Sequence, residues 1–221
     1  MSEGIFITDI LTFLNLQPVD SQILEQYPPV ISIENGESEL HEESHVMRVI
    51  IYAELICQFF EKLDIHVNRH AILSAIRIHD GYRRQEYNDE KDHGYVAMSH
   101  AYFNQIFVDD PSEKLILDLA RWHSVDDEEI LNQTGWEELP LELKIFKDAD
   151  ALDRYRDAYH DQVDGVDPNP EYFRLNVTHK LMPVAQAFCE SYFGTIRHRN
   201  KSVAENIIAI GESIGIIDQH P

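Results

Sequence analysis

Histidines and carboxylates are the side chains of this chain with the most scope for chemistry. The 221 residues include twelve histidines and 40 Asp and Glu, but only two cysteines. Imidazoles and carboxylates together suit divalent ions such as Zn, Mn, Fe or Co, whereas softer ions prefer thiolates. Cys57 and Cys189 are far apart and form no paired spacing, so a disulfide framework is excluded. The composition therefore indicates a metal site, provided that some of the histidines converge.

Several apolar helical patterns each place one such side chain on or beside their buried face. His79 and His123 follow apolar residues at intervals of three, four or seven, so both should point inward. Asp80 comes directly after His79, where that helix should end. His45 begins the first long apolar helix, and Asp150 lies one position from the apolar stripe of another. Because an unpartnered buried charge is costly, these side chains need one another or a cation.

This arrangement resembles the signature of the HD-domain superfamily of metal-dependent phosphohydrolases. That signature is a His, a later His-Asp pair and a distant Asp, each on a separate helix. The segment SHVMRV around His45 is similar to the first motif, and the pair corresponds to His79-Asp80. The segment DADALD around Asp150 is similar to the closing motif. The resemblance covers residues 45–155.

Members of that family that bind two metal ions have two further histidines between the pair and the last Asp. His93 and His123 resemble these two in order and in context. The resemblance implies one or two divalent ions, and it does not distinguish Fe, Mn, Co, Zn, Ni and Mg. The metal ligands that it implies are His45, His79, Asp80, His93, His123 and Asp150.

The activity implied by the resemblance is hydrolysis of a phosphoester in a small nucleotide or phosphorylated metabolite. Divalent ions lower the pKa of bound water toward ~7 and neutralise charge that develops on phosphoryl oxygens. Asp80 would bridge the ions or orient the nucleophile, and it is therefore the expected catalytic residue. A small phosphorylated molecule is the expected partner.

Binding of a phosphate group to an acidic chain requires cations close to the site. Arg83 and Arg84 follow the His-Asp pair, Lys91 precedes His93, and Arg154 follows the DADALD segment. Arginine suits this role because its guanidinium binds phosphate through two parallel hydrogen bonds. We expect these four residues to bind substrate; the alternative is that they offset neighbouring acidic residues.

Two other functions are compatible with the same ligands. A few members of the superfamily use a six-ligand set for di-iron oxygenase chemistry, and the sequence separates this poorly from hydrolysis. A binding or regulatory module could also hold a metal or a nucleotide without turnover. The presence of every expected ligand argues against that module. No Gly-Tyr-Pro motif follows the His-Asp pair, so hydrolysis of cyclic dinucleotides loses support.

Helices must position all these side chains, because apolar residues recur with helical spacing and no alternating run would form a substantial sheet. We therefore predict an all-α fold, a single helical bundle of the HD type. Asn35-Gly36 could form a short hairpin turn in the N-terminal segment. Residues 126–138 and 164–170 are predicted to be loops. The acidic residues at 126–129 are predicted to form a solvated surface. The predicted helices cover residues 5–16, 46–60, 71–79, 93–106, 115–123, 141–152, 184–196 and 203–214.

Three regions follow from this pattern: an N-terminal helix and irregular lead-in (1–44), a metal-binding core (45–160) and C-terminal helices packed on that core (161–221). Within the DADALD segment, Asp148 and Asp153 are expected either to support the metal ligands or to lie on the helix surface. Outside the motifs, His100 is expected to be either a hydrogen-bonded core histidine or a residue that supports the ligands, rather than a ligand itself.

The net charge limits the partners of the protein. With 18 Lys and Arg against 40 Asp and Glu, the formal charge is −22, which repels nucleic acid polymers and anionic lipids. No apolar run reaches the ~18 residues of a membrane span, and the N-terminus is acidic rather than basic. We expect a cytoplasmic protein without nucleic acid or membrane partners, and a homo-oligomer is compatible with the sequence.

Overall fold

The fold is known from a computed structural model that describes residues 7–30, 43–81, 93–156, 169–194 and 201–218. Across these ranges the chain forms ten α-helices and two short 3₁₀ helices, and one isolated bridge, between Val19 and Ile217, is its sole β pairing. The prediction of an all-α fold is confirmed. The HD type of the bundle and the division into three regions stay predictions.

The helices are α1 (Ile7–Phe13), α2 (Gln22–Gln26), α3 (Glu43–Lys62), α4 (Arg69–Ile76), α5 (His93–Phe103), α6 (Glu113–Trp122), α7 (Asp127–Thr134), α8 (Leu141–Leu152), η2 (Asp153–Arg156), η3 (Pro170–Tyr172), α10 (Asn176–Gly194) and α11 (Val203–Ile214).

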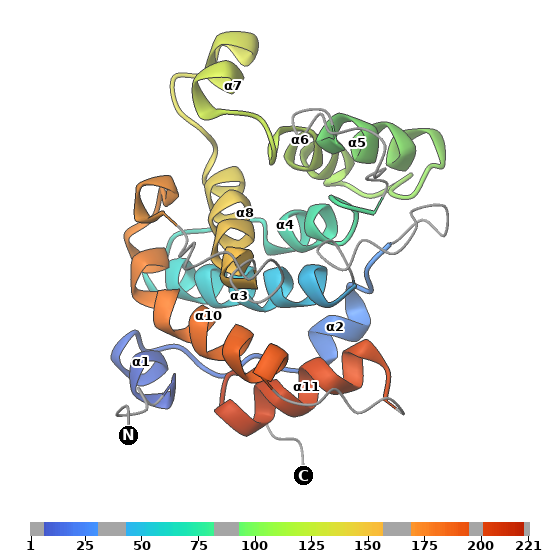
Figure 1. The fold of residues 1–221 in the computed structure, drawn as a ribbon. Helices are drawn as coiled ribbons and strands as arrows, with labels where there is room; N and C mark the ends of the chain where they lie inside the picture. The colour runs from blue at the N-terminus through green and yellow to red at the C-terminus, as the bar shows by residue number, and fades with distance from the viewer. Residues whose placement is uncertain (1–6, 31–42, 82–92, 157–168, 195–200, 219–221) are drawn as a thin grey trace.

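The central element is α3, which is packed on several sides. It contacts α4 and α8 on one side and α10 and α11 on the other, and it crosses the middle of the molecule in Figure 1. Its residues are apolar around most of the circumference, as is expected for a helix that is buried rather than amphipathic. Ile50, Ile51 and Leu55 are completely inaccessible. A side chain on α3 therefore faces the interior from nearly any position.

The helices α4, α5 and α6 form a second layer above α3. In Figure 1, α6 lies beside α5, and α4 lies between α6 and α3. The close approach of α5 to α6 depends on Gly94, because a Cβ atom at this position would lie 2.6 Å from the carbonyl oxygen of Arg121. The glycine thus lets the first turn of α5 pack against the last turn of α6.

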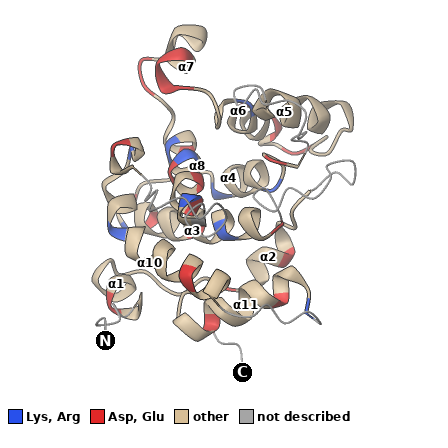
Figure 2. Ribbon diagram, viewed as in Figure 1, with Lys and Arg blue, Asp and Glu red and all other residues tan. Residues whose placement is uncertain are grey.

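The prediction of a loop over residues 126–138 is wrong, because α7 lies within that range. Its first turn contains Asp127, Glu128 and Glu129, visible as the acidic turn at the top of Figure 2. Acidic side chains stabilise a helix at its N-terminus, where the backbone N–H groups point outward. Gly135 ends the helix with a positive φ of 72°, which is a usual helix stop. The same acids that indicated a polar loop also favour a helix start.

Other differences concern helix ends. The first helix ends at Phe13 rather than at residue 16, and α4 ends three residues before the predicted end, so that 77–81 form turns. The helix α10 begins at Asn176, eight residues earlier than predicted, and continues through Pro183. The predicted hairpin turn lies outside the described residues. In the described part of the chain, no helix has the length and apolar character needed to cross a membrane.

Candidate metal centre

The structure brings together the six residues that the motifs predicted as ligands. They come from five places in the fold: His45 is the third residue of α3, His79 and Asp80 follow α4, His93 begins α5, His123 caps the end of α6, and Asp150 lies in the last turn of α8. His45 and His79 are only 1% exposed, and Asp80 and His123 are 6% exposed. The side chains of His93 and Asp150 are 13% and 27% exposed, so solvent reaches the cluster on their side.

One group of donors forms around His45 and His79. Their Nε2 atoms lie 3.2 Å apart, and each is 3.4 Å from Oδ2 of Asp80. Oδ1 of Asp150 lies 3.3 Å from Nε2 of His45 and 3.8 Å from Nε2 of His79. Three potential ligand atoms, from α8 and the turn after α4, therefore lie within 3.4 Å of Nε2 of His45.

A second group forms around His93 and His123. Their Nε2 atoms are 2.8 Å apart, and Nε2 of His93 lies 3.5 Å from Oδ1 of Asp80. Asp80 thus belongs to both groups, with one oxygen toward each. This is the geometry in which a single carboxylate can link two cations.

The helix ends determine which ring nitrogen points into the cluster. His79 and His123 both lie just beyond the last turn of a helix, where carbonyl oxygens have no intrahelical partner. Nδ1 of His79 donates to the carbonyl of Ile76 (2.6 Å), and Nδ1 of His123 donates to the carbonyl of Ala120 (2.8 Å). Because the ring proton is on Nδ1 in each neutral imidazole, the lone pair of Nε2 points toward the cluster.

The same tautomer is selected at His45, whose Nδ1 lies 2.8 Å from Oδ2 of Asp153. Nε2 of His45 and Nε2 of His79 therefore present lone pairs to each other at 3.2 Å. This contact is repulsive unless a cation, either a proton or a metal ion, lies between the two nitrogens. Two nitrogens bound to one tetrahedral ion at about 2.0–2.1 Å would be about 3.3 Å apart. The donor set and its spacing thus fit a divalent metal ion.

The electrostatics of the cluster favour the neutral imidazole of His123 and the ionised carboxylate of Asp150. Burial lowers the pKa of His123 well below its ordinary value, and His93 and His79 lower it further, so the ring stays neutral at pH 7. For Asp150, burial opposes ionisation. The hydrogen bond and charge of His45, together with His79, outweigh that effect and hold the pKa of Asp150 well below its usual range. Both groups are in the protonation state that a metal ligand needs.

No protein-family model, curated protein or solved structure matches this chain. The assignment of the cluster therefore depends on its residues and their geometry. Two groups of buried or half-buried histidine and aspartate side chains that could hold a metal ion are present among the described residues, and they share Asp80.

The sequence left two roles open for Asp153, support of a metal ligand or a place on the helix surface. It is completely buried, and it joins His45 to Arg48, so the interpretation of Asp153 as a surface acid is wrong. The signal was the spacing: Arg48 follows His45 by three residues and Asp153 follows Asp150 by three, which places each pair on one helix face.

Asp148 supports the fold rather than the cluster. Its carboxylate is completely buried and accepts hydrogen bonds from the backbone N–H groups of Arg174 and Leu175 and from the hydroxyl of Thr178. These bonds connect α8 to the two residues before α10 and to the first turn of that helix. The neighbouring acidic run is not merely a solvated surface, because Asp127 pairs with the guanidinium of Arg174 and with Lys147.

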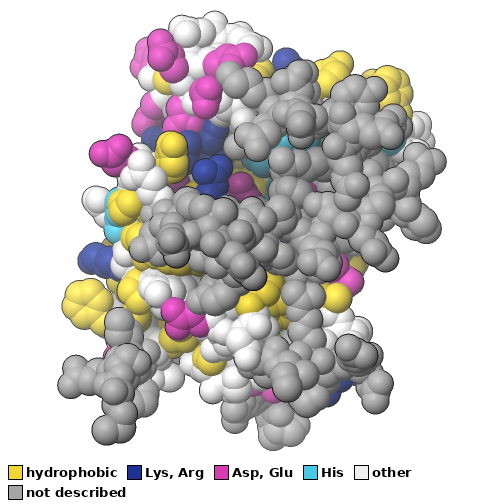
Figure 3. Space-filling model, viewed as in Figure 1, with side chains coloured by type: hydrophobic (Ala, Val, Ile, Leu, Met, Phe, Trp, Pro, Cys, Tyr) yellow, Lys and Arg dark blue, Asp and Glu magenta, His cyan; other side chains and the backbone are white. Residues whose placement is uncertain are grey.

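Of the four predicted substrate-binding cations, Arg154 lies within the described residues, whereas Arg83, Arg84 and Lys91 lie outside them. Arg154 is exposed and follows Asp150, the most accessible residue of the cluster, by four residues. Its guanidinium lies 5.6 Å from the ring centroid of Tyr172, and no acid among the described residues forms an ion pair with it. In Figure 3, cationic, acidic and histidine side chains gather in a recess below α7.

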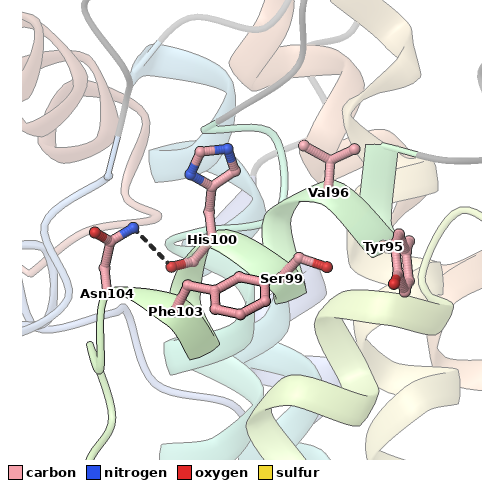
Figure 4. A pocket seen from close by; sticks show the side chains of 6 residues that line it. All are labelled: Tyr95, Val96, Ser99, His100, Phe103 and Asn104. Atoms are coloured by element: carbon pink, nitrogen blue, oxygen red, sulfur yellow. Dashed lines mark hydrogen bonds between the residues drawn. The ribbon is translucent and has the colours of Figure 1, made fainter.

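A separate shallow pocket lies along one face of α5. It has a volume of about 400 Å³ and contains none of the six cluster residues. His100 lines this pocket and is half-buried rather than in the core, and it belongs to neither of the two histidine and aspartate groups found among the described residues. In Figure 4, the side chain of Asn104 turns back to donate to the carbonyl oxygen of His100. The full lining is Tyr95, Val96, Ser99, His100, Phe103 and Asn104.

Proposed function

We propose that this protein is a metal-dependent phosphohydrolase with the ligand arrangement of the HD-domain superfamily. The observation that carries the proposal is the contact between Nε2 of His45 and Nε2 of His79, 3.2 Å apart, with both lone pairs directed at the same point. Carboxylate oxygens of Asp80 and Asp150 lie 3.4 and 3.3 Å from Nε2 of His45, and a second pair of histidines lies near the other oxygen of Asp80.

The charge of the cluster supports divalent ions and an anionic substrate. Arg48 matches the charge of Asp153, so Asp80 and Asp150 are the remaining carboxylates of the cluster, with a formal charge of −2 when both are ionised. One divalent ion would neutralise this charge, and two would leave the site with a charge of +2. A positive site in a chain of net charge −22 favours an anionic group over a neutral one.

In this proposal, His45, His79 and Asp150 would hold one ion, His93 and His123 would hold the other, and Asp80 would contribute to both groups. Divalent ions in these positions supply acidified water and neutralise the charge that develops on phosphoryl oxygens. Asp80 would accept a hydrogen bond from the attacking water and so orient it toward phosphorus. Arg154, one turn beyond Asp150, binds a phosphate oxygen of the substrate near the accessible edge of the cluster.

The experiment that tests this function is a substrate panel with the metal-loaded protein. Nucleoside mono-, di- and triphosphates and sugar phosphates are incubated with protein that contains Mn, Co, Mg, Zn, Ni or Fe, and phosphate or nucleoside release is measured. Release from at least one class, lost in the presence of a chelator, is the expected result. Absence of hydrolysis by protein with two bound ions would overturn the proposal, and oxygen consumption by the iron form would favour the di-iron oxygenase.

The variant His123→Ala is expected to bind one metal ion instead of two. His123 contributes to the second group alone, and its removal leaves the four donors around His45 and His79 intact. Elemental analysis of the loaded protein gives the count, with His66→Ala as the control because His66 is exposed in the connection between α3 and α4. A stoichiometry that is the same in both variants would show that the second group holds no ion.

The variant Arg154→Ala is expected to raise KM for the phosphorylated substrate about 10-fold, with a smaller change in kcat. The guanidinium would bind the phosphate equally in the ground state and the transition state, and loss of such uniform binding appears in KM. Lys180→Ala is a matched control, because Lys180 is also an exposed cation over an aromatic ring, that of Phe13. Equal KM values in the two variants would remove Arg154 from the substrate site.

A further inference from the structure

A buried ion pair between Arg48 and Asp153 contacts His45 at Nδ1, the ring nitrogen that faces away from the candidate metal centre. Nε of Arg48 donates to Oδ1 of Asp153 (2.6 Å), and Nη2 of Arg48 donates to Oδ2 of Asp153 (2.9 Å). Oδ2 of Asp153 also accepts the hydrogen bond from Nδ1 of His45. Each of the three residues is at most 1% exposed. The result is a chain of contacts from Arg48 through Asp153 to His45.

Stability alone is a weak explanation for this ion pair. A buried ion pair can be replaced by apolar side chains of similar volume with little loss of stability, and often with a gain. Apolar residues could not, however, direct the ring of His45. The carboxylate of Asp153 requires a proton on Nδ1 and thereby turns the lone pair of Nε2 toward His79.

Arg48 in turn controls the charge and orientation of Asp153. Burial opposes ionisation of this carboxyl, but the charge of Arg48, together with hydrogen bonds from His45 and Arg48, holds its pKa well below the ordinary range. The two parallel hydrogen bonds from Arg48 also restrict the plane of the carboxylate. A lysine would supply the charge without this planar geometry.

The helix α10 holds the guanidinium in place. The Cζ atom of Arg48 lies 5.0 Å from the ring centroid of Tyr192 and 5.3 Å from that of Phe193. Cys189, one turn earlier, lies 3.9 Å from Oδ1 of Asp153. These residues belong to the C-terminal region, beyond the part of the chain that carries the metal-binding motifs, and Figure 1 shows α10 running beside α3.

We propose that Arg48 and Asp153 are positioning residues of the metal centre and that α10, through Tyr192 and Phe193, is part of that centre. They fix the tautomer and direction of His45 and so raise the affinity for the ion between His45 and His79. This inference rests on the proposed metal centre. It adds that the C-terminal region is needed for metal affinity as well as for the fold.

The test compares Arg48→Lys with Arg69→Lys in the full chain. Arg69 is a matched control because it also forms ion pairs from a helix, with Glu54 and Glu61, but does not contact His45. The dissociation constant for Zn is measured by competition with a chromophoric chelator. We expect Arg48→Lys to raise it about 10- to 100-fold and Arg69→Lys to change it less than about twofold. Circular dichroism verifies that both variants are folded.

A second measurement separates positioning from general support of the fold. In the metal-free protein, ¹⁵N–¹H correlation spectra of histidine side chains should show the proton of His45 on Nδ1, and Arg48→Lys should shift part of that population to Nε2. If Arg48→Lys does not fold, Phe193→Leu replaces it, with a smaller increase of the dissociation constant in the same direction.

The outcomes distinguish this inference from the proposed function. An unchanged dissociation constant and an unchanged His45 tautomer in folded Arg48→Lys would overturn the positioning role and leave the metal centre intact. Failure of the wild-type protein to bind Zn or any other divalent ion would overturn the proposed function, and the tautomer of His45 would then decide the positioning role by itself.

Discussion

The variant Asp80→Ala is expected to lose metal from both groups and to reduce turnover by about 1,000-fold or more. Oδ2 of Asp80 lies 3.4 Å from Nε2 of His45, and Oδ1 lies 3.5 Å from Nε2 of His93, so no other residue of the cluster serves both groups. The variant should remain helical, because Asp80 and Asp150 are like charges in the metal-free protein and removal of one relieves their repulsion. Elemental analysis and circular dichroism on the same sample test both parts.

A matched control for this variant is Asp118→Ala, which removes a carboxylate that pairs with exposed Lys114 on the surface of α6. Its metal content should equal that of the wild-type protein. In addition, metal should raise the unfolding temperature of the wild-type protein and of Asp118→Ala but not that of Asp80→Ala. If Asp80→Ala retained two ions per chain, Asp80 would not connect the groups and the dinuclear arrangement would be refuted.

The variant Asp148→Ala is expected to have the opposite effect, a large loss of stability without a change in metal stoichiometry. Three donors would lose their buried acceptor, namely the backbone N–H groups of Arg174 and Leu175 and the hydroxyl of Thr178. The guanidinium of Arg174 would also lose one of its two carboxylate partners. We expect the free energy of unfolding to fall by about 3–5 kcal/mol.

Urea unfolding measures this loss, and Asp118→Ala again provides the comparison, with an expected change below about 0.5 kcal/mol because its ion pair is solvated. The folded fraction of Asp148→Ala should still bind the same number of ions per chain, since Asp148 contacts no residue of the cluster. A variant that kept its stability, or one that lost metal while folded, would contradict the role assigned to Asp148.

Local patterns were sufficient to predict most helices and the inward direction of His79 and His123, whereas the full set of six ligands came from the resemblance to the HD-domain superfamily. The intervals of three, four and seven residues that end at His79 and His123 reflect burial of one helix face, and burial is what brings those faces together. The donation from each Nδ1 to the carbonyl three residues earlier follows from the same position at a helix end. For these residues, the local sequence contains the physical cause of the geometry.

Pairings between distant parts of the chain could not be predicted in this way. Arg48 and Asp153 are 105 residues apart, and Asp148 caps a segment 26 to 30 residues further along. Whether a carboxylate on a helix meets water, a metal ligand or the backbone of another helix depends on tertiary packing. The acidic run at 126–129 shows the same limit, because Asp127 pairs with Arg174 only when α7 and the start of α10 lie together.

Anomalous diffraction from crystals of the protein grown with Mn or Zn tests the central claim most directly. We predict a peak within about 2.0–2.3 Å of Nε2 of His45 and Nε2 of His79, and a second peak beside Nε2 of His93 and Nε2 of His123. Fully loaded crystals without a peak between His45 and His79 would contradict the assignment of this cluster as a metal centre.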